Sequence, residues 1–199
     1  MDSKRVLIAL AASGLLAGTA SADDKTKTKD KTTPAAAAQE MPQLPQPGPE
    51  HQVMKEDVGT WDATVEAFMA PGAPPAVSKG TETNRLTAGG LWLVSDFKSE
   101  FMGQPFEGHG VMGWDPAKKK YVGTWVDSMT TSVSQSESTY DAASKTFTGW
   151  MEGPDETGKT VKTKAVTQLK SPDSKVFTMY RMEDGKEVPT LRITYTRRQ

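Results

Sequence analysis

The chain contains no cysteine, and its 199 residues include only two histidines. Without cysteine, neither a disulfide bond nor a lipid on an N-terminal cysteine can stabilise or anchor the protein. Acidic and basic side chains nearly balance, with a formal net charge of -1, and no basic stripe or long charged block follows residue 49. The charge pattern therefore gives no support for nucleic-acid binding or for docking on a membrane surface.

The two histidines, His51 and His109, limit the metal sites that the chain could build. Glu107 and His109 are two residues apart, so a strand would place both on one face, where they could supply two ligands. A catalytic metal site needs at least three protein ligands, and the sequence shows no further member of such a set. We therefore predict that His109 is exposed and structural, and we predict no metal site.

Sequence motifs of common enzymes are also missing. The chain has no G-x-S-x-G nucleophile elbow, and no glycine-rich nucleotide loop lies between a predicted strand and a predicted helix. Two histidines do not allow a Ser-His-Asp set to be assigned. We predict no cofactor and favour a protein without catalytic activity.

The first 22 residues have the three parts of a secretory signal peptide. Positive charges stand at residues 4–5, an apolar run follows over residues 6–18, and the sequence ASA occupies residues 20–22. The apolar run is shorter than the roughly 20 residues that cross a bilayer. We expect cleavage after Ala22 and export to the periplasm or the exterior, with no integral membrane segment left; an uncleaved anchor is the alternative.

Residues 23–48 combine lysines and aspartates with alanines and prolines, and they include no aromatic residue. Such a segment cannot bury enough apolar surface to offset its chain entropy. We predict a disordered linker that is semi-extended near its prolines.

Residues 49–199 contain all five tryptophans and are predicted to form one folded domain. A short helix is expected over residues 49–58, because Pro49 suits a first helical position and Gly59 suits the residue after a helix. From Trp61 to Met69, apolar and polar residues alternate, which is the pattern of a half-buried strand.

Turn sequences rich in Gly, Pro and Asp recur along the rest of the domain. They separate about ten short strands, which is typical of an antiparallel meander. A meander of this size must close on itself or stack as two sheets, because long open edges invite aggregation. We predict an all-β fold, a closed barrel with one short N-terminal helix.

The glycines within the run from Phe106 to residue 128 can be explained by strand pairing. A turn at residues 103–105 would place Phe97 opposite Gly110, and a loop at residues 115–120 would place Gly110 opposite Trp125. Gly110 would then free volume for two inward aromatic rings, while Lys98 and His109 face solvent. The alternative is that these glycines only mark β-bulges.

This pairing assigns candidate ligand-binding residues to the interior of the barrel: Phe97, Met112, Trp125, Asp127, Tyr180 and Tyr195. Asp127 is expected between the inward Trp125 and Met129. It could orient a polar group of a ligand, act as a general base, or bond Tyr180, Tyr195 or an inward arginine for structural reasons only.

Several runs resemble the DUF1579 family of uncharacterised bacterial proteins. They are VGTWDATVE (58–66), GGLWLVSDF (89–97), FEGHGVMGWDP (106–116), YVGTWVDS (121–128), MEDGKEV (182–188) and ITYTRR (193–198). The resemblance covers nearly all of residues 50–198. It implies a calycin-like (lipocalin-like) antiparallel barrel and no established activity.

The sequence GTW at residues 59–61 is similar to the lipocalin motif, in which a tryptophan plugs one end of the barrel beneath an arginine of the last strand. The resemblance implies that Trp61 pairs with Arg197, or else with Arg192. A cation over an indole contributes about 0.5–2 kcal/mol.

These observations predict an exported protein that binds a small, partly apolar ligand inside its barrel without catalysis. The alternatives are a tethered protein–protein interaction module with a filled barrel, and an enzyme that uses Asp127. The identity of the ligand and the oligomeric state do not follow from the sequence.

Overall fold

The computed structural model of the chain describes residues 43–70, 72–155 and 157–199. The predicted signal peptide, residues 1–22, and most of the predicted linker lie outside the described residues. The last part of that linker, residues 43–48, forms neither helix nor strand. The predicted domain of residues 49–199 lies within a single compact unit, Gln43–Gln199.

A short helix, α1 (His51–Glu56), precedes the strands. It is shorter at both ends than the predicted helix of residues 49–58. The imidazole Nδ1 of His51 accepts a hydrogen bond of 2.9 Å from the backbone N–H of Gly48, and His51 is buried. No helix formed by the described residues has the length and the hydropathy needed to cross a bilayer.

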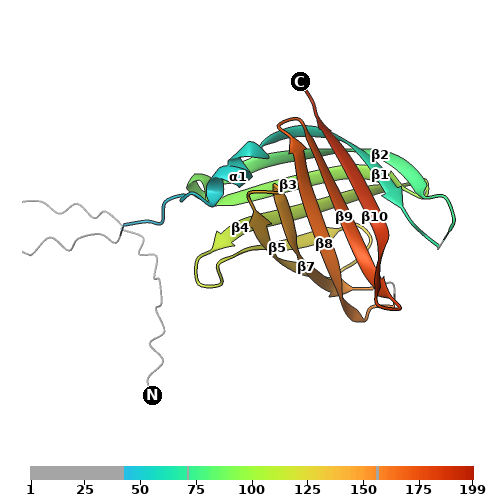
Figure 1. Cartoon of the computed structure of the whole chain (residues 1–199). Helices are drawn as coiled ribbons and strands as arrows, with labels where there is room; N and C mark the ends of the chain where they lie inside the picture. Colours follow the sequence, from blue (N-terminus) through green and yellow to red (C-terminus); the bar gives the residue numbers. More distant parts are fainter. Residues whose placement is uncertain (1–42, 71, 156) are drawn as a thin grey trace, which may run out of the picture. The chain divides into compact units, whose positions relative to one another are not determined.

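Within the described residues, ten antiparallel strands follow the helix and close into a barrel (Figure 1). They are β1 (Gly59–Ala67), β2 (Ala76–Thr87), β3 (Trp92–Phe101), β4 (Gln104–Asp115), β5 (Lys120–Asp127), β6 (Ser134–Asp141), β7 (Thr146–Pro154), β8 (Thr160–Ser171), β9 (Ser174–Glu183) and β10 (Lys186–Arg197). A single 3-10 turn, η1 (Ala88–Gly90), separates β2 from β3. Each strand pairs with the next in sequence, and β10 pairs with β1. The predicted all-β class and closed meander are confirmed.

The register between β4 and β5 agrees with the prediction, since Gly110 lies opposite Trp125. The predicted register between β3 and β4 is wrong by two residues, because Phe97 lies opposite Gly108 rather than Gly110. The reason is the turn: Met102 and Gly103 both have positive φ, of 51° and 78°, and form a tight two-residue hairpin. A shift of two residues keeps every side chain on its predicted face.

Helix α1 closes one end of the barrel. Val53 and Met54 pack with Leu93 of β3 and Tyr121 of β5 in a buried cluster. The Tyr121 hydroxyl donates a hydrogen bond of 2.7 Å to the carbonyl oxygen of Glu50, which holds the start of the helix against the barrel. We call this the helix end; the opposite end, where β1 joins β2 and β3 joins β4, is the open end (Figure 1).

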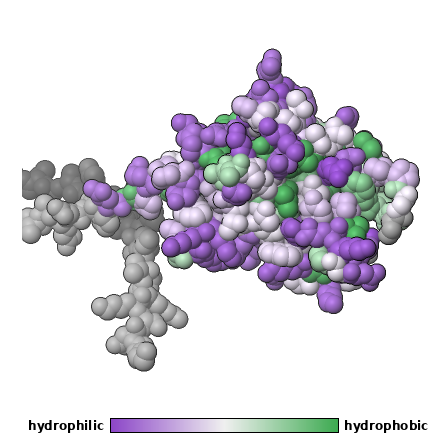
Figure 2. All heavy atoms as spheres, in the orientation of Figure 1, coloured by the Kyte–Doolittle hydropathy of each residue, from purple (hydrophilic) through white to green (hydrophobic). Residues whose placement is uncertain are grey.

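The outer surface is mostly hydrophilic in the view of Figure 2, with hydrophobic residues in separate patches. His109 is exposed, as predicted, and its Nδ1 lies 2.6 Å from the carboxylate of Asp96. Lys98, which was expected opposite His109, instead lies 3.2 Å from Glu107 because of the shifted register. The Lys98 and His109 side chains both face solvent.

Candidate functional site

The interior of the barrel contains a cavity of about 580 Å³. This volume falls within the range of small-molecule binding sites, roughly 300–1,000 Å³. Strands from all sides of the barrel contribute aromatic and aliphatic side chains to its wall, including Leu93, Phe97, Phe106, Met112, Trp125, Phe147, Met151, Phe177, Met179, Leu191 and Ile193.

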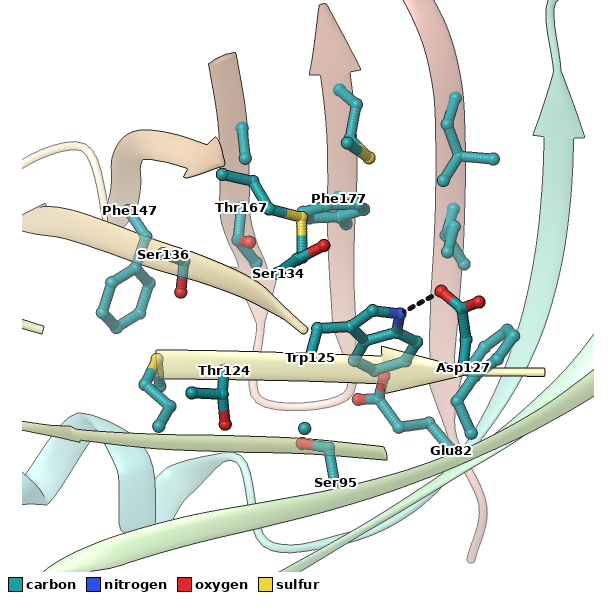
Figure 3. A pocket seen from close by; sticks show the side chains of 18 of the residues that line it. Glu82, Ser95, Thr124, Trp125, Asp127, Ser134, Ser136, Phe147, Thr167 and Phe177 are labelled. Atoms are coloured by element: carbon teal, nitrogen blue, oxygen red, sulfur yellow. Dashed lines mark hydrogen bonds between the residues drawn. The ribbon is translucent and has the colours of Figure 1, made fainter. Parts of the chain in front are cut away.

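The Trp125 indole projects into this cavity and is held by a carboxylate. Its Nε1 donates a hydrogen bond of 2.9 Å to Asp127 (Figure 3). The Asp127 carboxylate also accepts one of 2.9 Å from the backbone N–H of Met129. The indole lies over Gly108, where a Cβ atom would overlap its six-membered ring. The ring position therefore depends on the absence of a side chain at Gly108.

One wall of the cavity is made of small residues with hydroxyl groups. Ser134, Ser136 and Ser138 alternate along β6, so all three point into the barrel. Figure 3 shows Ser134 and Ser136 on the cavity wall together with Thr167 of β8. The cavity is thus apolar on most sides and offers hydroxyl groups along one side.

The cavity also reaches a buried charged cluster near the helix end, formed by Asp57, Glu82 and Lys175. The Lys175 ammonium group lies 2.7 Å from the Asp57 carboxylate and 2.8 Å from the Glu82 carboxylate. Only 4% of Lys175 and 8% of Glu82 is exposed to solvent. The buried Lys175 ammonium is therefore paired with two carboxylates inside the protein, as a buried cation requires. We call these three residues the floor cluster.

The surroundings at the floor cluster shift the pKa values of Lys175, Asp57 and Tyr195. Burial alone would lower the pKa of Lys175, but the carboxylates of Glu82 and Asp57 raise it above its usual value. Burial raises the pKa of Asp57, against the opposing effect of Lys175. Burial, with Glu82 beside the hydroxyl, raises the pKa of Tyr195 well above 10.0. Lys175 is therefore charged and Tyr195 neutral at ordinary pH.

Trp61 lies beside the floor cluster and contacts two cations. The Lys175 ammonium lies 4.7 Å from the centroid of its ring, and the guanidinium carbon of Arg197 lies 4.1 Å from it. Arg197 is the arginine that the family resemblance paired with Trp61. Arg192, the other arginine considered, instead lies 5.5 Å from the ring of Phe68.

Five of the six candidate ligand-binding residues line the cavity, namely Phe97, Met112, Trp125, Asp127 and Tyr195. Tyr180 does not belong to the lining. Strand β9 turns Lys175, Phe177 and Met179 inward, so Tyr180 lies on the outer face, where the Lys164 ammonium is 5.8 Å from its ring. Asp127 bonds Trp125 and Met129 rather than a tyrosine or an arginine.

The floor cluster was missed by sequence reasoning. Its members come from the residue after α1, from β2 and from β9, far apart in the chain. In the sequence, each of the three is only a single polar residue. Neither β2 nor β9 alternates between apolar and polar residues in a way that identifies which of its faces points into the barrel. Among the described residues, no three His, Asp or Glu side chains lie together in a way that could hold a metal ion.

Comparison with solved structures finds barrels of similar fold. The S-type phycobiliprotein lyase CPES from Guillardia theta is 11% identical with a TM-score of 0.50, over 75% of this chain and 93% of that chain. A de novo designed fluorescence-activating beta barrel is 17% identical, with a TM-score of 0.41, over 73% and 97% of the two chains. A redesigned beta barrel is 15% identical, with a TM-score of 0.38, over 74% and 96%. At an identity of 11%, the likeness to the lyase shows a shared fold alone.

A comparison with curated proteins finds no significant match. The match to a family model is extensive by contrast. It spans residues 46–197 and so includes the helix, all ten described strands and the cavity between them. The chain therefore belongs to the family described as "Protein of unknown function (DUF1579)".

Proposed function

We propose that the protein is exported and binds one small, partly apolar molecule inside its barrel without catalysing a reaction. The observation that carries this proposal is the cavity of about 580 Å³ with its mainly apolar wall. A small barrel either fills its interior with side chains or holds one small ligand. Apolar walls supply affinity, and a few polar groups fix the orientation of a ligand.

The arrangement at the helix end supports a lipocalin-like assignment within this proposal. A short helix leads into Gly59, Thr60 and Trp61 at the start of β1, and Arg197 from the last strand lies over the indole. Trp61 and helix α1 block this end of the barrel, since Trp61 and Met54 are almost fully buried. A ligand would therefore enter from the other end.

The open end carries exposed methionines that suit this route. Met69 follows β1, Met102 lies in the β3–β4 turn, Met129 follows β5 and Met182 lies near the end of β9; each is more than half exposed. Methionine is flexible and polarisable, so it adapts to apolar molecules of different shape. Met129 also lines the cavity, which connects this rim with the interior.

The same rim favours the second candidate function, a tethered module that binds a partner protein at its loops. That function was expected to go with a filled barrel. The size of the cavity argues against the filled barrel, so ligand binding remains the preferred proposal.

The proposal can be tested by titration with N-phenylnaphthylamine, an uncharged dye that fluoresces in apolar surroundings. We expect saturable dye fluorescence and quenching of tryptophan emission, since Trp125 projects into the cavity. Ser136→Phe would place a phenyl ring in the cavity, beside the other serines of β6, and should weaken binding of the dye at least about tenfold, or 1.4 kcal/mol. Gln135→Phe adds the same ring on the exposed outer face of β6 and should leave binding unchanged. Absence of saturable binding, or equal effects of the two variants, would contradict the proposal.

A further inference from the structure

We infer that the floor cluster selects the ligand by its polar end: the cavity accepts an amphiphile that ends in a hydrogen-bond donor, a hydroxyl or an ammonium group, and rejects one that ends in a carboxylate. This inference rests on the proposed binding function and adds the chemical class of the ligand. It depends on the charge, the hydrogen bonds and the position of Glu82.

The floor cluster has an excess of negative charge. Asp57 and Glu82 contribute two carboxylates, and Lys175 contributes one ammonium group between them. Arg197 also acts electrostatically on Asp57, but its guanidinium lies 3.3 Å from the carboxylate of Asp173 and bonds the carbonyl oxygens of Glu56 and Val58. Like charges brought together in a buried site repel strongly, so an anionic end group is disfavoured there.

The floor cluster also has more acceptors than donors. Asn84 lies beside it, and its Nδ2 is within 3.3 Å of three oxygens, two of Asp57 and one of Glu82, which fixes the orientation of the amide. The Oδ1 atom of Asn84 is buried and has no hydrogen-bond partner among the described residues. Asn84 itself does not line the cavity, but Asp57 and Glu82 do, and their carboxylates have more acceptor positions than Lys175, Asn84 and the Tyr195 hydroxyl fill. A further donor is therefore what this end of the cavity can accept.

Glu82 is the member with remaining capacity for a ligand. Its Oε1 accepts from both Asn84 and Lys175, at 2.9 Å and 2.8 Å, and the Tyr195 hydroxyl also donates to the carboxylate. A carboxylate has about four acceptor positions, so one remains for a donor on a ligand. The side chain lines the cavity and is shown there in Figure 3. Glu82 lies opposite Phe97 of β3 in the sheet, so an acceptor stands directly beside the apolar wall. An apolar chain along that wall would bring its end group to the Glu82 carboxylate.

The test uses three probes with the same chain: dodecanol, dodecylamine and dodecanoate, each displacing N-phenylnaphthylamine from the intact protein below its aggregation concentration. We expect dodecanol and dodecylamine to displace the dye and dodecanoate to bind at least about tenfold more weakly, because like charges at close range cost more than the 1.4 kcal/mol of a tenfold change. This comparison needs no variant. Equal displacement by all three would overturn the inference and leave the binding function intact.

A pair of carboxylate variants locates the selection. Glu82→Gln keeps an oxygen for Lys175 and removes one negative charge, so the preference for dodecylamine over dodecanoate should fall about tenfold or more. Glu107→Gln is the matched control, since it removes a charge from the exposed outer face, where Glu107 pairs with Lys98, and should preserve the preference. An equal loss of the preference in both variants, or a loss in Glu107→Gln alone, would overturn the inference. If the dye itself does not bind, the binding function fails first.

Discussion

Gly108 and Trp125 share one volume: the six-membered ring of the indole lies where a side chain at position 108 would begin. Gly108 faces Phe97 on β3 and Asp127 on β5 in the sheet. This arrangement allows a large ring to project into the cavity while its Nε1 bonds Asp127.

Gly108→Ala should displace the Trp125 indole and cost about 1–3 kcal/mol of unfolding free energy, the usual range for overpacking. Urea unfolding and the tryptophan emission spectrum measure both effects. The companion variant Gly110→Ala should cost less, since its Cβ would lie 3.1 Å from the same ring. Combination with Trp125→Phe should restore much of the loss at position 108. Additive costs in the double variant would show that the two residues do not compete for space.

Lys175→Met should destabilise the protein by roughly 3–5 kcal/mol, because it leaves two buried carboxylates without their cation. The distances of 2.7 Å and 2.8 Å to Asp57 and Glu82 are the basis of this expectation. Lys98→Met is the matched control, since Lys98 pairs with Glu107 on the exposed surface and should contribute less than about 1 kcal/mol. Similar losses for the two variants in urea unfolding would refute a structural role for the floor cluster.

Arg197→Met should cost roughly 2–4 kcal/mol, because the guanidinium both lies over Trp61 and bonds the carbonyl oxygens of Glu56, Val58 and Pro172. Those bonds tie the end of α1 to the last strand. Arg192→Met is expected to cost under about 1 kcal/mol, since its ion pair with Glu66, at 3.8 Å, is long and lies near the surface. Thermal unfolding followed by circular dichroism compares the stability of the two variants. If Arg192→Met were less stable than Arg197→Met, the assignment of Arg197 as the partner of Trp61 would be wrong.

Stability should decline as the pH rises above about 10. Burial raises the pKa of Tyr121 to about 12, and the pKa values of Tyr195 and Lys175 are also above their usual values. A group with a raised pKa in the folded state stabilises the protein fully below its unfolded pKa and loses this effect as the pH passes its folded pKa. Tyr121→Phe should make the decline between pH 10 and pH 12 shallower. A free energy of unfolding that is flat over this range would contradict these shifts.

The sequence predicted the barrel and most of the cavity wall because β3, β4 and β5 separate apolar from charged residues. The β4–β5 register followed from the loop after Asp115, whose carboxylate accepts hydrogen bonds from the backbone N–H groups of Ala117 and Lys118. The predicted β3–β4 register was wrong because the turn consists of Met102 and Gly103. Methionine at the first position does not indicate a two-residue turn, as asparagine or aspartate would.

Tyr180 was placed inside the barrel because β9 offers apolar residues on both faces. Phe177 and Met179 alternate with Val176 and Tyr180, so the pattern does not distinguish the inner from the outer side. The floor cluster could not be predicted for a different reason. Its charges are brought together only when β2 and β9 join the closed barrel. No pattern within a single segment of the sequence predicts these contacts.

Native mass spectrometry of the protein purified gently from its own host tests the central claim most directly. Our account predicts one bound small molecule per chain in the wild type and in Gln135→Phe, and its loss from Ser136→Phe, which fills the cavity wall. Repeated preparations of folded wild-type protein without any bound mass, or a mass retained equally by Ser136→Phe, would contradict the claim that the interior of this barrel is a ligand-binding site.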